Sequence, residues 1–322
     1  MVKIAIAGAS SQLAREVLDK LVDIRRHEII AFSRKDPAQF PSLQGVEWVQ
    51  TTYEDKSELV RLLKGVHTVL CFFVVHLDPG SNTQKRLIDA AVEAEVKRYA
   101  PSEWSTGTST ELSIDFLPWY RNKVEIRHYL ENLNAAKKVL EYTTFQPGAF
   151  MNYLGHPHQT ANYITTIPMQ IDVEKLHALL VHGFLDQHMT FTSVQDIGGV
   201  VARAVEYTGE WPVVGGVSGS RVTIRELLQM GERVRGKPFT IQWLRLEDVE
   251  AGIIKSNHLI PVNSLHSATG DEMETVNKAA TIGMLISICR GAWDVTDEWN
   301  QILPDYKFTQ VEEFLTKVWG RK

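Results

Sequence analysis

The sequence has few cysteines, no long apolar run and no excess of positive charge. Its 322 residues include only two cysteines, Cys71 and Cys289, which excludes a disulfide framework and a thiolate metal cluster. The longest apolar run, residues 69–75, is far shorter than the roughly twenty residues that a membrane-spanning helix needs. The formal net charge is −5, so no positive field is available to hold nucleic acid. We therefore expect a cytoplasmic protein without a membrane span.

The first half of the chain alternates short apolar segments with helical segments. The periodicity predicts strands at residues 2–7, 28–33, 46–51, 67–75, 97–101 and 141–146, with helices after the first, third, fourth and fifth of them. Such alternation implies right-handed crossovers and a parallel sheet that is covered on both faces. The sequence therefore predicts a doubly wound α/β sheet of the Rossmann type. Because the first strand begins at residue 2, no secretory signal is expected.

After Gly148 the pattern becomes irregular, and short apolar pieces alternate with turn-forming residues. We expect segments 189–193 and 212–217 to return to the main sheet. Helices are predicted at about 224–235, 246–255, 272–289 and 309–319. The expected dinucleotide-binding domain thus covers residues 1–152 and about 186–222, and a smaller, discontinuous α+β substrate-binding region covers about 153–185 and 223–322.

The turn after the first strand is where this fold places the phosphates of a dinucleotide, because backbone N–H groups and a helix N-terminus meet there. The expected contacts are Gly8 and the residues that follow it: Ser10, Ser11, Gln12 and Leu13. Serine and alanine occupy positions 11 and 14, where a G-x-x-G-x-x-G turn would repeat glycine. The hydroxyl of Ser11 either crowds a pyrophosphate or donates a hydrogen bond to it. A plain strand-to-helix turn is the alternative interpretation.

The end of the second strand indicates which dinucleotide would bind. An NAD site usually has a carboxylate at this position for the ribose 2′-OH, whereas the 2′-phosphate of NADP requires a cation. The sequence here is Ser33-Arg34-Lys35. Arg34 and Lys35 therefore favour NADPH as the cofactor, and a solvated basic turn is the alternative.

Several longer stretches are similar to one protein family. They are Leu62–Val69, Leu87–Arg98 leading into Pro101-Ser-Glu-Trp104, Phe145–Leu154 and Leu303–Leu315. With these stretches the chain resembles, over nearly its whole length, the NmrA-like and isoflavone reductase-like group of atypical short-chain dehydrogenases/reductases. The resemblance implies a Rossmann fold, an NADPH-dependent oxidoreductase and a role in secondary metabolism. The chain departs from the group at Ser11 and Ala14, where glycines are usual.

The resemblance implies that Lys123 faces the nicotinamide and acts as the general acid or base. Burial beside a cofactor would lower the pKa of Lys123 toward neutrality, where proton transfer is useful. Tyr120 lies three residues earlier, so the two side chains share a helix face, and Tyr120 either assists as a proton donor or stacks on the substrate. A solvated helical lysine is the alternative to a catalytic one.

Residues that follow other strands complete the expected site. Ser102 and Phe73 stand at the carboxyl ends of the fifth and fourth strands, where open parallel sheets bind ligands, and Phe150 follows the sixth. Glu103 either takes part in the site or braces the next loop. The expected substrate contacts are aromatic and favour a flat ligand, although aromatics are also common in cores: Trp119, Tyr120, Phe150 and Tyr153.

The histidines of the second half lack the spacing of a metal site. His156 and His158 are separated by one proline, and neither a Cys pair nor a His-x-x-x-His signature with a carboxylate accompanies them. We therefore expect no metal. One of the histidines could still act as an acid or base, since imidazole titrates near neutrality.

Together these features predict an NADPH-dependent reductase of a small aromatic or polyketide/phenylpropanoid-like substrate, with Lys123 as general acid/base. Two alternatives stay open. The altered glycine turn is compatible with a cofactor-free isomerase, dehydratase or cyclase that uses the same cleft. A non-catalytic, NADP(H)-sensing regulator of the NmrA type is the other, although Lys123 speaks against it. The sequence does not fix the oligomeric state, and a homodimer is compatible with it.

Overall fold

A six-stranded parallel sheet organises the N-terminal half of the protein. The computed structural model describes residues 1–262 and 270–320. The strand order is β3-β2-β1-β4-β5-β6, so the order reverses between β1 and β4. The strands are β1 (Lys3–Ala7), β2 (Glu28–Ser33), β3 (Val46–Gln50), β4 (Thr68–Cys71), β5 (Arg98–Ala100) and β6 (Glu141–Tyr142). The predicted doubly wound α/β fold is confirmed.

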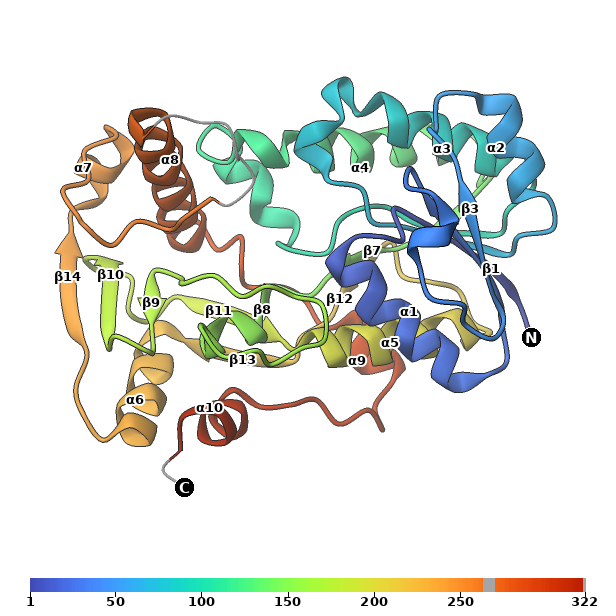
Figure 1. Cartoon of the computed structure of the whole chain (residues 1–322). Coiled ribbons are helices and arrows are strands. Elements are labelled where there is room, and N and C mark those ends of the chain that lie inside the picture. The colour runs from blue at the N-terminus through green and yellow to red at the C-terminus, as the bar shows by residue number, and fades with distance from the viewer. Residues whose placement is uncertain (263–269, 321–322) are drawn as a thin grey trace.

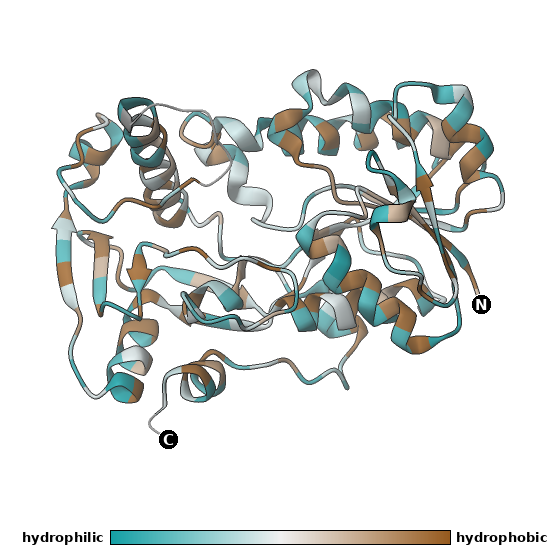
Figure 2. Cartoon of the chain, viewed as in Figure 1, coloured by the Kyte–Doolittle hydropathy of each residue, from teal (hydrophilic) through white to brown (hydrophobic). Residues whose placement is uncertain are grey.

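Helices cover both faces of this sheet, as Figure 1 shows. One face carries α1 (Gln12–Ile24) and α5 (Val194–Glu206), and the other carries α2 (Lys56–Leu63), α3 (Asn82–Glu93) and α4 (Arg121–Asn134). In α1 the apolar positions 13, 17, 18 and 21 lie on one side of the helix and are buried against the sheet. Figure 2 shows the corresponding apolar and polar stripes along α1 and α5.

The chain after β6 builds three smaller sheets. β7 (Thr144–Gln146) follows β6 after one residue and pairs with β12 (Val214–Gly216). A second sheet contains β8 (Ala149–Phe150), β11 (His188–Thr192) and β13 (Ser220–Thr223), and a third contains β9 (Ile171–Asp172), β10 (His177–Val181) and β14 (Thr240–Leu244). The predicted return of 189–193 and 212–217 to the main sheet is wrong. β11 pairs with β8 and β13, and β12 pairs with β7 in a separate two-stranded sheet.

The remaining helices pack around these smaller sheets. They are α6 (Ile224–Arg235), α7 (Leu246–Glu250), α8 (Gly270–Cys289), α9 (Glu298–Ile302) and α10 (Val311–Trp319). Helix α7 is shorter than predicted because the chain turns at Gly252, whose φ of +76° lies in the left-handed region. Among residues 1–262 and 270–320, no helix has the length and apolarity required to cross a membrane. The domain boundaries stay a prediction.

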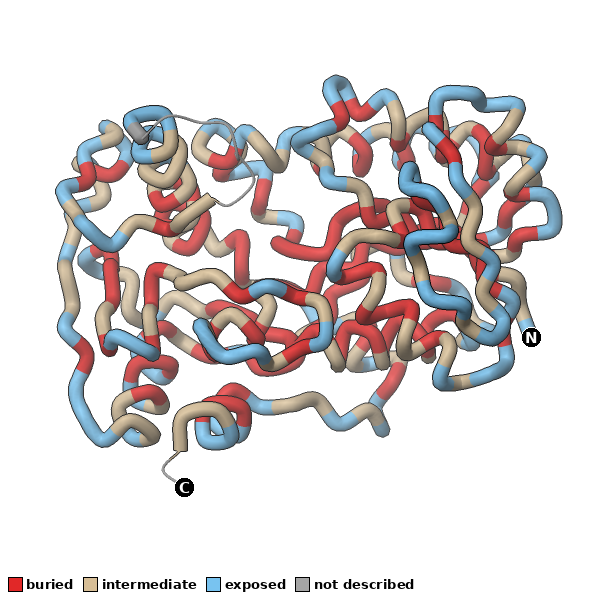
Figure 3. Tube along the Cα trace, viewed as in Figure 1, coloured by how far each residue is buried: buried red, intermediate tan, exposed pale blue. Residues whose placement is uncertain are grey.

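A stack of aromatic rings lies in the core between the main sheet and the second half. The ring centroids of Phe72 and Trp104 are 4.4 Å apart, those of Trp104 and Phe145 are 5.2 Å apart, and those of Phe145 and Trp299 are 5.4 Å apart. The indole N–H of Trp104 donates to the carbonyl of Cys71 at 2.7 Å, which satisfies its polar group in the core. Figure 3 shows that this central part of the chain is buried, whereas the outer turns of the helices are exposed. The stack therefore packs the end of β4 and β7 against α9.

Candidate active site

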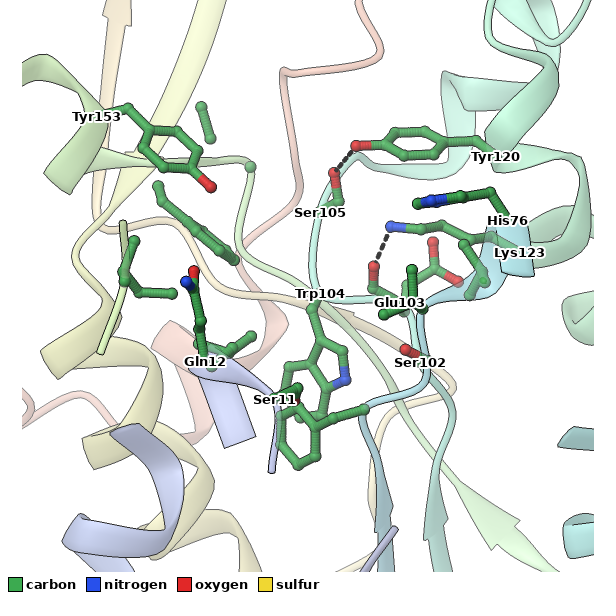
Figure 4. Close-up of a pocket in the computed structure, with 18 of the residues that line it drawn as sticks. Ser11, Gln12, His76, Ser102, Glu103, Trp104, Ser105, Tyr120, Lys123 and Tyr153 are labelled. Atoms are coloured by element: carbon green, nitrogen blue, oxygen red, sulfur yellow. Dashed lines mark hydrogen bonds between the residues drawn. The ribbon is translucent and has the colours of Figure 1, made fainter. Parts of the chain in front are cut away.

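A cleft of about 430 Å³ opens at the carboxyl ends of β1, β4 and β5, where the strand order reverses. Ligands bind at this position in open α/β sheets. One wall consists of the turn after β1, the ends of β4 and β5 and the start of α4, and the opposite wall consists of residues after position 147. Figure 4 shows the two walls, with Lys123 and Tyr120 on one side and Tyr153 on the other.

The turn after β1 is shaped to receive an anion. Gly8 has a φ of +73°, and a Cβ there would lie 2.9 Å from the carbonyl oxygen of Phe72, so only glycine fits. Ser11 is the N-cap of α1 with an extended backbone that needs no glycine. Its Oγ is buried without a hydrogen-bond partner among the described residues, and the first turn of α1 has neither a side-chain cap nor an acidic residue. This arrangement fits the phosphates of a dinucleotide.

Two of the expected cofactor positions also have partners within the protein. The Gly8 N–H donates to the hydroxyl of Tyr53 at 2.9 Å, and the Tyr53 ring packs edge-on against Phe73. The Gln12 side chain donates to Thr165 Oγ1 at 2.9 Å and accepts from the Thr165 N–H at 3.2 Å. Gln12 therefore joins the start of α1 to the wall that carries the later residues.

Arg34 and Lys35 lie outside the cleft, at the end of β2, and both side chains are exposed. The turn after β1 is close to this strand, because the Ala9 N–H donates to the carbonyl of Phe32 at 3.0 Å. In the described part of the chain neither cation forms an ion pair with a carboxylate. Both are therefore free to bind a 2′-phosphate next to the turn.

Lys123 is buried in the wall of the cleft, with 7% of its surface exposed. Its Nζ donates to the backbone carbonyl of Glu103 and lies 4.2 Å from the centroid of the Tyr120 ring. Burial lowers the pKa of Lys123 from its usual 10.5 to about 8, an effect that Glu103 opposes and Arg127 reinforces. The amine can therefore gain and lose a proton near neutral pH.

Several hydroxyl groups line the same cleft as this amine. The Tyr120 hydroxyl lies 3.0 Å from Ser105 Oγ, and burial raises the pKa of Tyr120. Burial likewise raises the pKa of Tyr153, across the cleft, to about 12. Both phenols are therefore neutral hydrogen-bonding groups around neutral pH. Ser102 Oγ donates to the carbonyl of Phe73 at 2.7 Å, which joins the ends of β4 and β5.

Trp119 does not line the cleft, so its predicted place at the substrate is not where the structure puts it. It lies in the short 3₁₀ turn Pro118–Tyr120 before α4, edge-on to Tyr120. A Cβ on Gly283 of α8 would lie 3.0 Å from the Trp119 ring, which shows that the indole fills the gap left by that glycine. Trp119 therefore packs against α8 instead of facing a ligand.

The histidine pair also lies outside the cleft. His156 Nδ1 is 3.2 Å from both oxygens of Thr166, and His158 packs edge-on against Trp319. Within residues 1–262 and 270–320, no three His, Cys, Asp or Glu side chains converge to hold a metal ion.

Sequence reasoning missed His76, Ser105 and Arg127. His76 lines the mouth of the cleft from the 3₁₀ turn Val75–Leu77, and partial desolvation of its ring lowers its pKa. Asn122 fixes this turn to α4, because its amide donates to the carbonyls of Val75 and Asp78, each at 2.6 Å. A histidine directly after the apolar run 69–75 was the available signal, since the carboxyl end of a parallel strand is where ligands bind.

The wall opposite Lys123 is apolar apart from one hydroxyl. Besides Phe150 and Tyr153, it contains Ile164, Ile167, Met169, Ile260, Met284 and Trp293. These residues come from chain segments that are far apart in sequence. The wall fits an uncharged, largely apolar molecule.

The strand order, the anion-binding turn and the cleft at the reversal point define a doubly wound α/β protein of the dinucleotide-binding class. Within this class, the chain belongs to the NmrA-like family, whose model matches residues 2–315. The resemblance inferred from the sequence motifs is thereby confirmed.

Known relatives match the chain over almost its whole length. Oxidoreductase BOA1 of Botryotinia fuckeliana is 22% identical over 95% of this chain and 97% of its own length. Isoflavone reductase of Cicer arietinum is 24% identical over 91% of this chain and 86% of its own. Among solved structures, AtPrR2 with NADP+ and (+)pinoresinol is 17% identical, covers 98% of both chains and has a TM-score of 0.69. At this identity the structural likeness supports the fold.

Proposed function

We propose that the protein is an NADPH-dependent oxidoreductase that reduces a small aromatic or polyketide/phenylpropanoid-like substrate. The observation that carries this proposal is one cleft that joins an anion-binding turn to a buried lysine with a near-neutral pKa. Relatives that span most of the chain are named oxidoreductase or reductase, which supports the redox class.

The residues present fit NADPH. Ser11 Oγ and the uncapped N-terminus of α1 would hold the pyrophosphate, Gly8 allows its close approach, and Arg34 with Lys35 would bind the 2′-phosphate. Bound NADPH would supply the hydride. Phe73 and Ser102, at the ends of β4 and β5, and Phe150, in the opposite wall, also line this cleft.

Lys123 would provide the proton that reduction of a carbonyl or enone requires. Because the pKa of Lys123 is about 8, the amine is charged at lower pH, so it can donate a proton to the substrate oxygen and take one back from solvent. The Tyr120 hydroxyl, which contacts Ser105 Oγ, would donate a hydrogen bond to the same oxygen. Because the surrounding walls are largely apolar, these polar contacts act in a medium of low dielectric constant.

The opposite wall supports an aromatic or polyketide-like substrate. Phe150 and Tyr153 can stack on a flat ring system, and Met169 and Met284 adapt to irregular shapes. The similar solved structure, AtPrR2 with NADP+ and (+)pinoresinol, contains an aromatic ligand.

Titration of the purified protein with NADPH and with NADH tests the proposal. We expect NADPH to bind in the micromolar range and NADH much more weakly. Arg34→Ala should weaken NADPH binding roughly tenfold to a hundredfold, the loss of one charged hydrogen-bond partner, and leave NADH binding unchanged. Arg61→Ala, which removes another exposed arginine, one on α2, is the matched control and should change neither.

Failure of both nucleotides to bind at millimolar concentration would refute the reductase. The hydrogen bond from the Gly8 N–H to Tyr53 would then favour the second candidate, a cofactor-free isomerase, dehydratase or cyclase in the same cleft, because a backbone donor of the turn is already occupied. Tight NADPH binding without consumption of NADPH across aromatic ketones and enones would favour a non-catalytic sensor.

A further inference from the structure

A buried ion pair lies directly behind Lys123. The Arg127 guanidinium donates from Nε to Glu103 Oε2 at 3.2 Å and from Nη2 to Glu103 Oε1, and Nη2 also reaches the carbonyl of Gly107 at 3.1 Å. Only 2% of the Glu103 side chain and 8% of the Arg127 side chain are exposed. Removing two charges from water is costly, so a pair in this position needs close geometry to be tolerated.

Both members of the pair act on Lys123. The backbone carbonyl of Glu103 accepts the hydrogen bond from the lysine Nζ, so whatever fixes the Glu103 side chain also fixes this acceptor. Arg127 stands four residues after Lys123 in α4, one helical turn away on the same face. The carboxylate favours the charged amine and the guanidinium disfavours it, so the two effects oppose each other.

The other titratable groups around the amine are uncharged near neutral pH. Tyr120 and Tyr153 have pKa values that burial raises, and His76, which lines the same cleft, has a pKa that burial lowers. In the described part of the chain, Glu103 and Arg127 are therefore the full charges that decide the electrostatic environment of Lys123.

We propose that the Glu103–Arg127 pair is a positioning device that holds the Glu103 carbonyl against the Lys123 amine and sets two opposite charges beside it, so that neither charge alone decides its protonation. This inference rests on the proposed role of Lys123 as the acid or base. Arg127 does not line the cleft itself; it acts through Glu103, which does.

The test measures the protonation of Lys123 without substrate or cofactor. The full-length protein is treated with formaldehyde and cyanoborohydride over a range of pH values, and mass spectrometry follows the rate at which each lysine is methylated. Exposed Lys64 serves as the internal reference. The rate follows the free amine, so its midpoint gives the pKa of Lys123. Because NADPH titration reads the proposed function separately, failure of one does not imply failure of the other.

Three variants give different expected shifts. Glu103→Gln keeps the backbone carbonyl but removes the negative charge, so the Lys123 midpoint should fall by about one to two units. Arg127→Met leaves Glu103 uncompensated, so the midpoint should rise by a similar amount. The double variant Glu103→Gln/Arg127→Met removes both charges and should return the midpoint to within about half a unit of the wild-type value.

A comparable ion pair provides the matched control. Arg98 and Glu141 lie 2.8 Å apart at the amino end of β5, whereas Glu103 follows its carboxyl end. Glu141→Gln therefore breaks a largely buried pair without changing the charges near Lys123, and its Lys123 midpoint should equal that of the wild type.

A purely structural pair would change the labelling rate of Lys123 without moving its midpoint, and this result would overturn the inference. Equal shifts in the same direction for the two single variants would overturn it as well, as would a Lys123 that stays unlabelled up to pH 10. If Arg127→Met does not fold, Glu103→Gln and the double variant decide: a fall in the first and recovery in the second support the pair, and any other combination refutes it.

Discussion

The close approach of Gly8 to β4 makes a specific prediction for Gly8→Ala. An alanine at φ +73° carries the strain of the left-handed region, about 1–2 kcal/mol. Its Cβ would also lie 2.9 Å from the oxygen and 3.1 Å from the carbon of the Phe72 carbonyl, which is backbone and cannot rotate away. Overpacking of this kind costs about 1–3 kcal/mol. We therefore expect Gly8→Ala to lower the free energy of unfolding by about 2–5 kcal/mol.

Gly65→Ala separates the two contributions. Gly65 has a nearly identical φ of +78°, but a Cβ there meets no atom within 4 Å, so only the strain of about 1–2 kcal/mol should remain. Urea unfolding followed by tryptophan fluorescence and circular dichroism compares the two variants, and NADPH titration shows whether only Gly8→Ala weakens binding. Equal losses of stability in the two variants would refute the argument that contact with Phe72 makes glycine necessary.

Three further predictions follow from the cleft. Lys123 has a pKa of about 8 in the folded state and near 10.5 in the unfolded state, so the unfolded state binds more protons between pH 8 and pH 10.5. Over this range the free energy of unfolding of the wild type, measured by calorimetry, should therefore rise by about 2–3 kcal/mol relative to that of Lys123→Met. Parallel curves for the two proteins would contradict this. Ser11→Ala should weaken NADPH binding about three- to tenfold in a fluorescence titration. The Tm should not fall, because Ser11 Oγ has no hydrogen-bond partner among the described residues. Unchanged affinity for NADPH would exclude a role of Ser11 at the pyrophosphate. Tyr120→Phe should reduce turnover by roughly a hundredfold and leave the NADPH Kd unchanged, whereas Ser105→Ala should reduce turnover less. A larger loss of turnover in Ser105→Ala than in Tyr120→Phe would show that Ser105, and not Tyr120, contacts the substrate.

The sheet could be predicted from the sequence because its strands are short apolar segments bounded by turn residues. The prediction failed where apolar residues serve another purpose. Residues 67–75 were predicted as one strand, but β4 ends at Cys71, and the following residues turn away to line the cleft. Segment 189–193 forms a strand as predicted but pairs elsewhere, since periodicity specifies a strand and not its neighbour.

The site could be predicted from sequence where its residues follow directly from the positions of the strands and helices. Ser102 and Phe73 follow strands whose carboxyl ends meet at one edge, and Lys123 and Tyr120 share the start of one helix. The opposite wall could not be predicted, because residues such as Ile164, Ile260 and Met284 converge from distant segments without a common period. Arg127 could have been found, since it lies one helical turn after Lys123.

The aromatic stack makes tryptophan fluorescence sensitive to whether a ligand occupies the cleft. Trp104 lines the cleft and stacks through Phe145 on Trp299, whose ring centroid is 6.0 Å from that of Trp211. Tryptophans this close exchange excitation energy, so light absorbed by any one of them can be emitted or quenched at another. A molecule that enters the cleft and absorbs where tryptophan emits, as a reduced nicotinamide does, would quench the fluorescence of all these tryptophans. Occupancy can therefore be read from intrinsic fluorescence without attaching a label.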